Sequence, residues 1–513
     1  MTTQLHPGGA SPAGSAALAR RFGGAPRRLG RSQWQVAPIG FGAYRVHDDN
    51  PAHRQALEEA LRCGINLIDT SATYTDGGSE RLIGGVLAQL FADHVLQRDQ
   101  VVVVSKAGYL QGPLLEAAKA RPTPYPEIVE YLAGCWHCIH PELLAEQIEA
   151  SRQRLGLARI DVYLLHNPEY FLIDRRNRGG VDDDDRERLY RRIAAAFAYL
   201  ERAVLEGLIG CYGVSSNALA GDAPEHIELD RLLEIAREVG GEAHHFAVIE
   251  LPLNLLEGSA LRDREPTPAG PRTALEIAAA ADLGVLVNRP LSGFVQDPEP
   301  RLIRLADLPE SGRARASDPL PLLRAAERLE LEWQRTLGDE LAREGDDPRF
   351  RDLFRWGREL SAGLPAIRDI NHWIRLRNGV IAAHMGQLGA LLHTSLSGDH
   401  LARFRAFWDE YGAVLEAALD SIEDGLRAQA QAVLDQITER LDAALPLDLR
   451  PLTLSQKAVL TLLAAPVSAV LVGARIPAYV HDIAALAPWL TQPAFLGLDP
   501  AEALRAFVPT PLH

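Results

Sequence analysis

Short apolar runs alternate with longer helical patterns along the chain as far as Leu291. The runs VAPIG, INLID, VVVVSK, IDVYLLH, IGCYGVS, HFAVIE and GVLVN predict strands at residues 36–40, 65–69, 101–106, 160–166, 209–215, 245–250 and 284–288. Helical periodicity follows at residues 51–63, from 79, and at 141–155, 187–206, 227–239 and 273–281. The run VVVVSK is apolar at successive positions, which suits a strand buried on both faces, as in parallel sheets.

An eighth unit follows after a long interruption. Residues 454–463 predict a helix, AVLV at 469–472 a strand, and the chain from Pro477 another helix. Eight strands, each paired with a helix, predict an α/β fold, a (β/α)8 TIM barrel with a large α-helical insertion between units 7 and 8. A doubly wound sheet is the alternative, but no G-x-G-x-x-G follows the first strand.

The interruption at residues 296–450 has a helical pattern. Apolar residues recur there in steps of three, four and seven, which predicts one apolar stripe on a long helix: Leu401, Phe404, Trp408, Tyr411, Leu415, Ile422, Leu426, Val433, Ile437 and Leu441. Such a stripe must be covered by the barrel surface, by other helices of the insertion, or by a second subunit. We therefore expect a barrel at 26–295, a helical insertion at 296–450, and a closing unit with a C-terminal tail at 451–513.

The first 25 residues contain no Asp or Glu and are rich in Gly, Ala, Ser and Arg. A transit peptide and a disordered tail both have this composition, and the lack of an apolar core favours a disordered tail at 1–25. The net charge of −15 disfavours nucleic acid as a partner. No apolar run approaches the roughly 18 residues of a membrane span. Four cysteines in 513 residues make no disulfide framework, which indicates a reducing compartment and a cytoplasmic location.

Four chemically capable side chains lie at or just after three successive predicted strands: Asp69, Tyr74, Lys106 and His166. Barrel active sites form at the carboxyl ends of the strands, so these side chains are expected to converge on one mouth. An ammonium near a tyrosine lowers the phenol pKa from about 10, Asp69 can hold Lys106, and His166 can donate to a carbonyl oxygen. Such a set can protonate a carbonyl while a nicotinamide supplies hydride.

Five motifs of the chain resemble those of the aldo-keto reductase family. They are APIGFGAYR (37–45), GINLIDTSATY (64–74), VVVVSKAG (101–108), DVYLLHNPE (161–169) and YGVSSN (212–217). The resemblance covers roughly residues 27–291 and again 452–485, and it has no counterpart for the insertion. It implies that Asp69, Tyr74, Lys106 and His166 are the catalytic tetrad. It also implies an NADP-dependent oxidoreductase domain, with NADP as the cofactor and NAD as the second choice.

The cofactor contacts that the resemblance implies match less closely. They are Ser215, Ser216 and Asn217 for the carboxamide, Glu250 where the family has Gln, Arg289, Pro290 and Leu291 beside the nicotinamide, and Gly473, Arg475 and Asp482 at the phosphate and adenosine end. Asn288 or Arg289 replaces the usual stacking aromatic residue, and an arginine plane can stack. Arg475 favours binding of the 2′-phosphate of NADP. Ile483 stands near a position where the family has a residue that holds the adenine, and its side chain cannot form that hydrogen bond.

Two features of the sequence allow another interpretation. CWHCIH at 135–140 looks like half a zinc or redox site, but no second Cys/His pair has ligand spacing, so we expect a substrate-side loop and no metal. An NADP(H)-binding sensor or scaffold acting through its insertion is the alternative function, against which the intact tetrad argues. The leading hypothesis is an oxidoreductase that reduces aldehydes and ketones, or oxidises the corresponding alcohols or lactols, with hydride from or to a nicotinamide. Its substrate is expected to be a small carbonyl compound, alcohol or sugar. The insertion is expected to narrow substrate access, with self-association as a further option.

Overall fold

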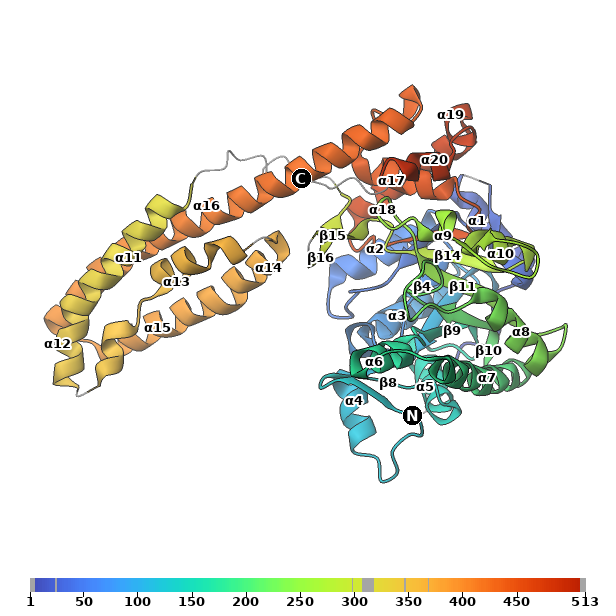
Figure 1. Ribbon diagram of the computed structural model, residues 1–513, viewed down its shortest axis with the longest axis horizontal. Coiled ribbons are helices and arrows are strands. Elements are labelled where there is room, and N and C mark those ends of the chain that lie inside the picture. Colours follow the sequence, from blue (N-terminus) through green and yellow to red (C-terminus); the bar gives the residue numbers. More distant parts are fainter. Residues whose placement is uncertain are drawn as a thin grey trace. The chain divides into compact units, whose positions relative to one another are not determined.

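The computed structural model describes residues 5–23, 25–297, 299–306, 318–345, 347–367 and 369–507 (Figure 1). Eight parallel strands close into a barrel in the order β10-β11-β14-β17-β3-β4-β5-β9. The strands are β3 (Ile39–Gly42), β4 (Leu67–Asp69), β5 (Val102–Ala107), β9 (Ile160–His166), β10 (Ile209–Ser215), β11 (Phe246–Pro252), β14 (Gly284–Asn288) and β17 (Ala469–Val472). Because β17 pairs with both β14 and β3, it closes the ring after the long insertion. The predicted barrel and the place of its insertion are confirmed.

Helices alternate with these strands as the sequence predicts. They are α2 (Pro51–Arg62), α3 (Gly78–Ala92), α5 (Pro141–Leu155), α7 (Asp183–Leu205), α8 (Leu229–Gly240), α10 (Ala274–Ala280), α17 (Leu454–Leu463) and α18 (Pro477–Ala484). Side chains cap the N-termini of several of these helices. At the start of α10, for example, Thr273 and Glu276 form a reciprocal capping box. Val104, Val162, Leu164 and Val248, from three barrel strands, belong to one buried apolar cluster.

Several further elements lie outside the eight strand–helix units. After β5 come a three-stranded sheet of β6 (Tyr109–Gln111), β8 (Cys135–His137) and β7 (Val129–Leu132), and the helix α4 (Gly112–Lys119). The helix α6 (Tyr170–Arg178) follows β9. Small two-stranded pairs join β1 (Arg27–Arg28) with β2 (Gln35–Val36), and β12 (Arg264–Glu265) with β13 (Arg272–Thr273). Short helices α9 (Ser259–Arg262), α19 (Pro493–Leu496) and α20 (Pro500–Arg505) complete this part of the chain.

The expectation of a disordered tail at residues 1–25 is wrong for the described part of that segment. Residues 12–19 form the helix α1 (Pro12–Ala19), which buries Leu18 and Ala19 completely. The amide of Ala10 donates to Asp161 Oδ1 at 2.7 Å, and Asn66 Nδ2 donates to the Ser15 carbonyl at 3.1 Å. The alanine-rich stretch therefore packs on the barrel, because its small side chains allow close contact. Residues 1–4 and 24 lie outside the described residues.

The chain divides into two compact units, one of Met1–Ala306 with Arg440–Pro511 and the other mainly of Asp307–Glu439. The second is helical: α11 (Leu320–Arg335), α12 (Leu337–Glu344), α13 (Trp356–Gly363), α14 (Ile370–Arg375), α15 (Ala382–Ser395) and the 47-residue α16 (Gly398–Ala444). Its core contains Trp333, Trp373, Phe404 and Tyr411. The predicted stripe on α16 is buried largely in this core, so other helices of the insertion cover it, and the long helix is confirmed.

The predicted insertion bounds of 296–450 need correction. β15 (Ser292–Asp297) pairs in antiparallel register with β16 (Glu299–Arg304), and this hairpin belongs to the barrel unit. The second bound is also shifted, because α16 continues past Glu439 into the barrel unit without a break in its periodicity. Residues 307–317 of the predicted insertion lie outside the described residues.

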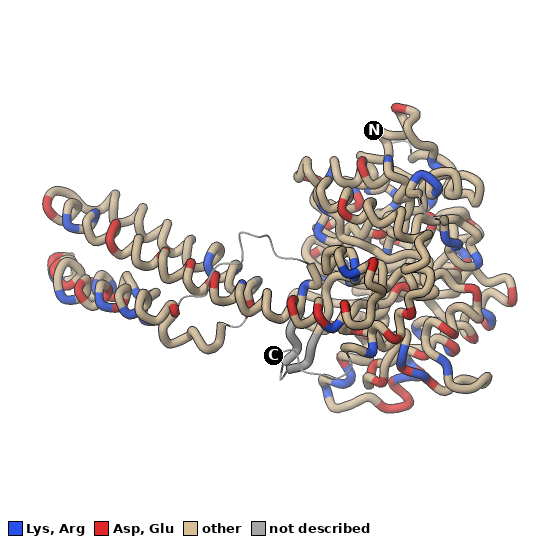
Figure 2. Tube along the Cα trace, turned by 90° about the horizontal axis from the view of Figure 1, so that it is seen from above, with Lys and Arg blue, Asp and Glu red and all other residues tan. Residues whose placement is uncertain are grey.

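Charged residues of both signs are spread over both units (Figure 2). Three carboxylates of α16 form ion pairs with Arg377, which precedes that helix: Glu416, Asp420 and Glu423, at 2.7–2.8 Å. None of the helices in the described part of the chain combines the length and the apolar character that crossing a membrane requires.

Candidate active site

Lys106 lies at the bottom of the candidate site, fully buried on β5. Its Nζ donates to Asp69 Oδ1 at 2.5 Å and to the Thr70 carbonyl at 3.1 Å. A second carboxylate, Glu250 Oε2, lies 3.2 Å from the same Nζ. β4, β5 and β11 thus place one ammonium between two buried carboxylates.

The electrostatics of this group follow from its burial. Burial alone would lower the pKa of Lys106, but Asp69 and Glu250 together raise it, so the ammonium stays charged. Burial and the Glu250 carboxylate raise the pKa of Asp69 well above its usual range, against the opposite effect of Lys106. One lysine therefore does not fully compensate two carboxylates in a site that excludes water.

The Nζ of Lys106 lies over the ring of Tyr74, 5.3 Å from the centre of the phenol ring. The pKa of Tyr74 is raised overall, because burial, with Asp69 and Glu250, outweighs the opposite effect of Lys106. Thr75 and Asp76, the next two residues, adopt left-handed backbone angles with φ of 49° and 54°. Thr75 Oγ1 donates to the Val46 carbonyl at 2.7 Å, which holds this unfavourable turn in place.

Positive φ angles at non-glycine residues recur around the same mouth. Arg45 follows β3 with φ of 65°, Asn167 follows β9 with φ of 50°, and Arg289 follows β14 with φ of 50°. Left-handed angles are strained for such residues and cluster at functional sites in many proteins. The strain supports a functional site at the carboxyl ends of the strands.

His166 ends β9, as the sequence predicts. Its Nδ1 lies 3.3 Å from Ser71 Oγ, and its ring centre is 6.1 Å from that of Tyr74. Burial, with further contributions from Lys106 and His137, lowers the pKa of His166 well below its usual range. The ring is therefore neutral at physiological pH and can donate one hydrogen bond.

An aromatic wall next to His166 was not predicted. Tyr109 of β6 packs edge-on against His166, His137 and Tyr170, with ring centres 4.7, 5.5 and 5.0 Å apart. Asn167 Nδ2 donates to Tyr109 Oη at 2.5 Å, and His137 Nε2 contacts the His166 carbonyl at 2.8 Å. Tyr109 stands directly after the SKAG motif, and this closeness is the only sign of the wall in the sequence.

Of the residues expected to hold the carboxamide, Ser215 and Glu250 lie in the site itself. Ser215 Oγ donates to Glu250 Oε1 at 3.1 Å, and Asn288 Nδ2 donates to the same oxygen at 2.9 Å. Glu250 thus faces Lys106 with one oxygen and two neutral donors with the other. Sequence reasoning placed Glu250 among the cofactor contacts and missed its contact with the lysine.

Ser216 and Asn217 are held by a buried carboxylate. Ser216 Oγ and the amide of Asn217 donate to the two oxygens of Glu169 at 2.8 and 3.0 Å. Burial raises the pKa of Glu169 to about 7, although both hydrogen bonds oppose the shift. Glu169 therefore fixes the backbone that follows β10.

The remaining predicted cofactor residues lie at the ends of β14 and β17. Arg289 Nη2 donates to Glu257 Oε1 at 2.8 Å, and the guanidinium covers Phe294 at 5.3 Å. Pro290 is buried and Leu291 half-buried in the turn that follows. Gly473 is exposed and Arg475 half-buried after β17. Asp482 Oδ1 accepts from Gln456 Nε2 at 2.8 Å, so this carboxylate already pairs within the fold.

Among the described residues, the CWHCIH segment does not belong to a group of three ligating side chains that lie close together. Cys135 and Cys138 are buried free thiols, and burial raises the pKa of Cys138 to about 11. His137 is engaged with His166 as described above, and burial lowers its pKa to about 4. The segment supplies β8 and the aromatic wall, which fits the expected loop beside the mouth.

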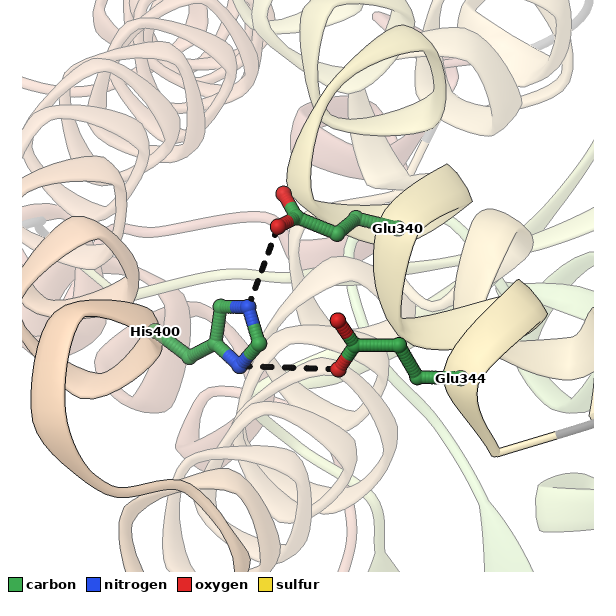
Figure 3. Close-up of side chains that lie close together, drawn as sticks. All are labelled: Glu340, Glu344 and His400. Atoms are coloured by element: carbon green, nitrogen blue, oxygen red, sulfur yellow. Dashed lines mark hydrogen bonds and ion pairs between the residues drawn. The ribbon is translucent and has the colours of Figure 1, made fainter.

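Among the described residues, one group of ligating side chains lies close enough together to hold a metal ion: Glu340, Glu344 and His400 in the helical unit (Figure 3). His400 Nε2 lies 3.2 Å from Glu340 and Nδ1 lies 3.8 Å from Glu344. Arg403 Nη1 occupies the other oxygen of Glu340 at 2.8 Å. A guanidinium at this point opposes a second cation, so we interpret the group as an ion-pair cluster that joins α12 to α16.

Residues 38–292 match the model of the aldo/keto reductase family. The matched stretch contains seven of the eight barrel strands. It also contains the four candidate catalytic residues, Asp69, Tyr74, Lys106 and His166. The barrel of this chain belongs to the aldo/keto reductase family.

This aldo/keto reductase is 28% identical over 252 residues to the NADH-specific methylglyoxal reductase of Escherichia coli (strain K12), covering 47% of the chain and 68% of that protein. It is 30% identical over 192 residues to the D-threo-aldose 1-dehydrogenase of Pseudomonas sp., covering 35% of the chain and 50% of that protein. Among solved structures, the aldo-keto reductase AKR11C1 from Bacillus halodurans (holo form) matches with 22% identity and a TM-score of 0.35, over 59% of this chain and 77% of that one.

Proposed function

We propose that this aldo/keto reductase is an NAD(P)H-dependent oxidoreductase that reduces aldehydes or ketones, or oxidises alcohols or lactols. The observation that carries the proposal is the buried ammonium of Lys106, 2.5 Å from Asp69 and 5.3 Å from the ring centre of Tyr74. A phenol in contact with a charged ammonium can lose or regain its proton more readily than an isolated buried phenol. Asp69, Tyr74, Lys106 and His166 are the catalytic residues of this proposal.

Each side chain has a distinct role in reduction. Tyr74 donates its proton to the carbonyl oxygen, while a bound nicotinamide supplies hydride to the carbonyl carbon. Lys106 lowers the pKa of Tyr74 against the effect of burial. Ser71 Oγ occupies His166 Nδ1, and we assign the Nε2 proton to a hydrogen bond with the substrate oxygen. In the reverse direction the tyrosinate would take the alcohol proton, and an oxidised nicotinamide, when bound, would accept the hydride from the same carbon.

The residues around the mouth fit a nicotinamide dinucleotide. Asn288 Oδ1 is a buried acceptor with no hydrogen-bond partner among the described residues, which suits an amide donor on a ligand. A Cβ built on Gly473 would meet nothing nearer than the Gly42 carbonyl at 4.0 Å, so the backbone after β17 is open to a phosphate. We assign the carboxamide to Ser215, Asn217 and Asn288, and the phosphates to Gly473 and Arg475.

A carbonyl panel with both reduced cofactors tests the proposed function. Methylglyoxal, aromatic aldehydes and ketones are offered with NADPH or NADH, and D-aldoses with the oxidised forms, while the absorbance of the reduced nicotinamide is followed. We expect turnover of at least one substrate class. Binding of neither cofactor, measured by fluorescence quenching, would contradict the proposal whatever the substrate.

The choice of cofactor is tested separately. A guanidinium matches phosphate in a bidentate fork, so we expect NADP(H) to bind more tightly than NAD(H) through Arg475. Arg475→Ala should weaken NADPH binding by roughly tenfold and leave NADH binding unchanged. Equal affinities for the two cofactors in the unmodified protein would refute this assignment.

A further inference from the structure

A second concave site lies in the barrel unit, lined by residues of α6, α7 and the segment from Glu127 to Glu130. The cavity measures about 500 Å3, within the range of small-ligand pockets. Its lining is dominated by five arginines: Arg175, Arg178, Arg188, Arg191 and Arg192. Three carboxylates also line it, and Asp184 and Asp185 lie within 4.0 Å of three of these arginines from outside the lining.

Three of these guanidinium groups surround one phenyl ring. The Cζ atoms of Arg192, Arg175 and Arg188 lie 4.7, 5.2 and 5.7 Å from the centre of the Phe171 ring. Phe171 is only 6% exposed. Each guanidinium gains a cation–π contact, but three like charges on one ring also repel one another. An anion in the cavity would relieve that repulsion.

The carboxylates already present neutralise these arginines unevenly. Asp185 serves both Arg175, at 3.3 Å, and Arg188, at 4.0 Å. Arg191 approaches Asp184 only to 4.0 Å, and that carboxylate is 73% exposed. Charge-assisted hydrogen bonds are about 2.7–2.9 Å long, so Arg188 and Arg191 retain donors for a ligand.

Arg192 forms the inner wall of the cavity. Its side chain is 7% exposed and lies 3.3 Å from Glu127 Oε2, and it also donates to the Glu127 carbonyl. Burial lowers the pKa of Arg192, against the effect of Glu127. A buried guanidinium beside two exposed ones is an arrangement that suits an anion with more than one charged group.

We propose that this cavity binds a small, multiply charged anion through phosphoryl or carboxylate groups, which Arg188, Arg191 and Arg192 contact. Both groups present paired oxygens that match the guanidinium fork. The site uses none of the residues assigned to the oxidoreductase reaction, so the two proposals stand or fall separately.

Calorimetric titration of the full chain at fixed ionic strength tests the proposal, with pyrophosphate and citrate as separate probes. We expect saturable binding of at least one of them. Binding of pyrophosphate alone would assign a phosphorylated ligand, and binding of citrate alone a polycarboxylate. Absence of saturable binding of both probes up to about 10 mM would overturn the proposal.

Three variants locate the binding. Arg188→Ala/Arg191→Ala removes two side chains that are 46% and 64% exposed, and it should weaken the probe at least roughly tenfold. Arg202→Ala, an exposed position on the same helix outside the cavity, is the matched control and should bind as before. Arg475→Ala tests whether the probe binds instead where the cofactor phosphates are proposed to bind, and it should leave binding of the probe unchanged. Binding that survives the double variant, or that is lost in Arg475→Ala or Arg202→Ala, would overturn the assignment.

Discussion

At the scale of single residues, the balance between burial and charge decides the state of Lys106. Burial disfavours its charge, but the two carboxylates at 2.5 and 3.2 Å outweigh that effect. Because both carboxylates also act on Tyr74, the pKa of the phenol depends on Glu250 as well as on Lys106. Glu250 is therefore a positioning residue, which acts on the proposed proton donor through its own charge and through the lysine that it contacts.

Glu250→Gln tests this role through the pH profile. The negative charge of Glu250 raises the pKa of Tyr74, so its removal should lower that pKa. Reduction needs the protonated phenol, and the basic limb of kcat/KM for reduction should move to lower pH. Oxidation needs the phenolate, and its rise with pH should begin at lower pH. The measurement is kcat/KM in both directions across the pH range.

Glu257→Gln is the matched control, since Glu257 pairs with Arg289 and its charge should not affect Tyr74. The groups that face Tyr74 electrostatically are Lys106, Asp69 and Glu250, and the control changes none of them. Identical pH profiles for Glu250→Gln and the unmodified protein would show that Glu250 does not influence the proton donor.

At the scale of elements, the sequence predicts best those segments whose apolar runs end at clear turn residues. β9, β10, β14, β17, α5 and α17 have the predicted bounds, because buried runs such as IDVYLLH and GVLVN are flanked by polar or turn-forming residues. α1, α6 and the β6–β8–β7 sheet were not predicted. Their residues show weak periodicity, and packing on the barrel or pairing within a loop stabilises them instead.

The sequence likewise predicts one part of the candidate site and misses another. Asp69, Tyr74, Lys106 and His166 could be placed together, since they lie at or just after the ends of strands that are neighbours in the ring. The contact between Lys106 and Glu250 could not, because β9 and β10 separate β5 from β11 in that ring. A contact that crosses the barrel leaves no local spacing in the sequence.

Removal of residues 1–23 tests the N-terminal element. The segment buries Leu18, Ala19 and Phe22 and supplies a hydrogen bond to the buried Asp161. We expect the deletion to lower the free energy of unfolding by more than about 3 kcal/mol, from lost apolar burial and a lost partner of a buried carboxylate. Urea unfolding measures the change, and Leu18→Ala should reproduce about 2–5 kcal/mol of it. An unchanged unfolding curve for the deletion would mean that the segment does not pack.

At the scale of the whole molecule, the chain contains two units with separate cores. The helical unit buries Trp333, Trp373, Phe404 and Tyr411 in its own cluster, and Glu330 accepts there from Tyr411 Oη at 2.8 Å and from the Gly357 amide at 2.6 Å. The barrel unit holds the candidate active site and the arginine-lined cavity. We propose that the helical unit, residues 307–439, influences substrate range or self-association and does not take part in the chemistry.

Trp333→Ala tests the independence of the two units. Trp333 is 1% exposed and donates to the Phe350 carbonyl, so its truncation should cost about 3–5 kcal/mol within the helical unit. Calorimetry should then show one thermal transition lowered and the other unchanged, with NADPH binding retained. Phe197→Ala, fully buried in the barrel unit, is the matched control and should lower the other transition. A single transition that shifts as a whole in both variants would contradict independent cores.

The central claim is that Tyr74 is the proton donor of a carbonyl reductase, and Tyr74→Phe tests it most directly. With the best substrate of the panel and saturating NADPH, we predict that single-turnover hydride transfer falls by about 10²–10⁴-fold, the typical value of a positioned general acid. The Kd of NADPH should change little. Tyr44→Phe is the control, because that ring lies 5.2 Å from Tyr74 and is 60% exposed, and it should react as the unmodified protein does. Hydride transfer at the unmodified rate in Tyr74→Phe would contradict the account.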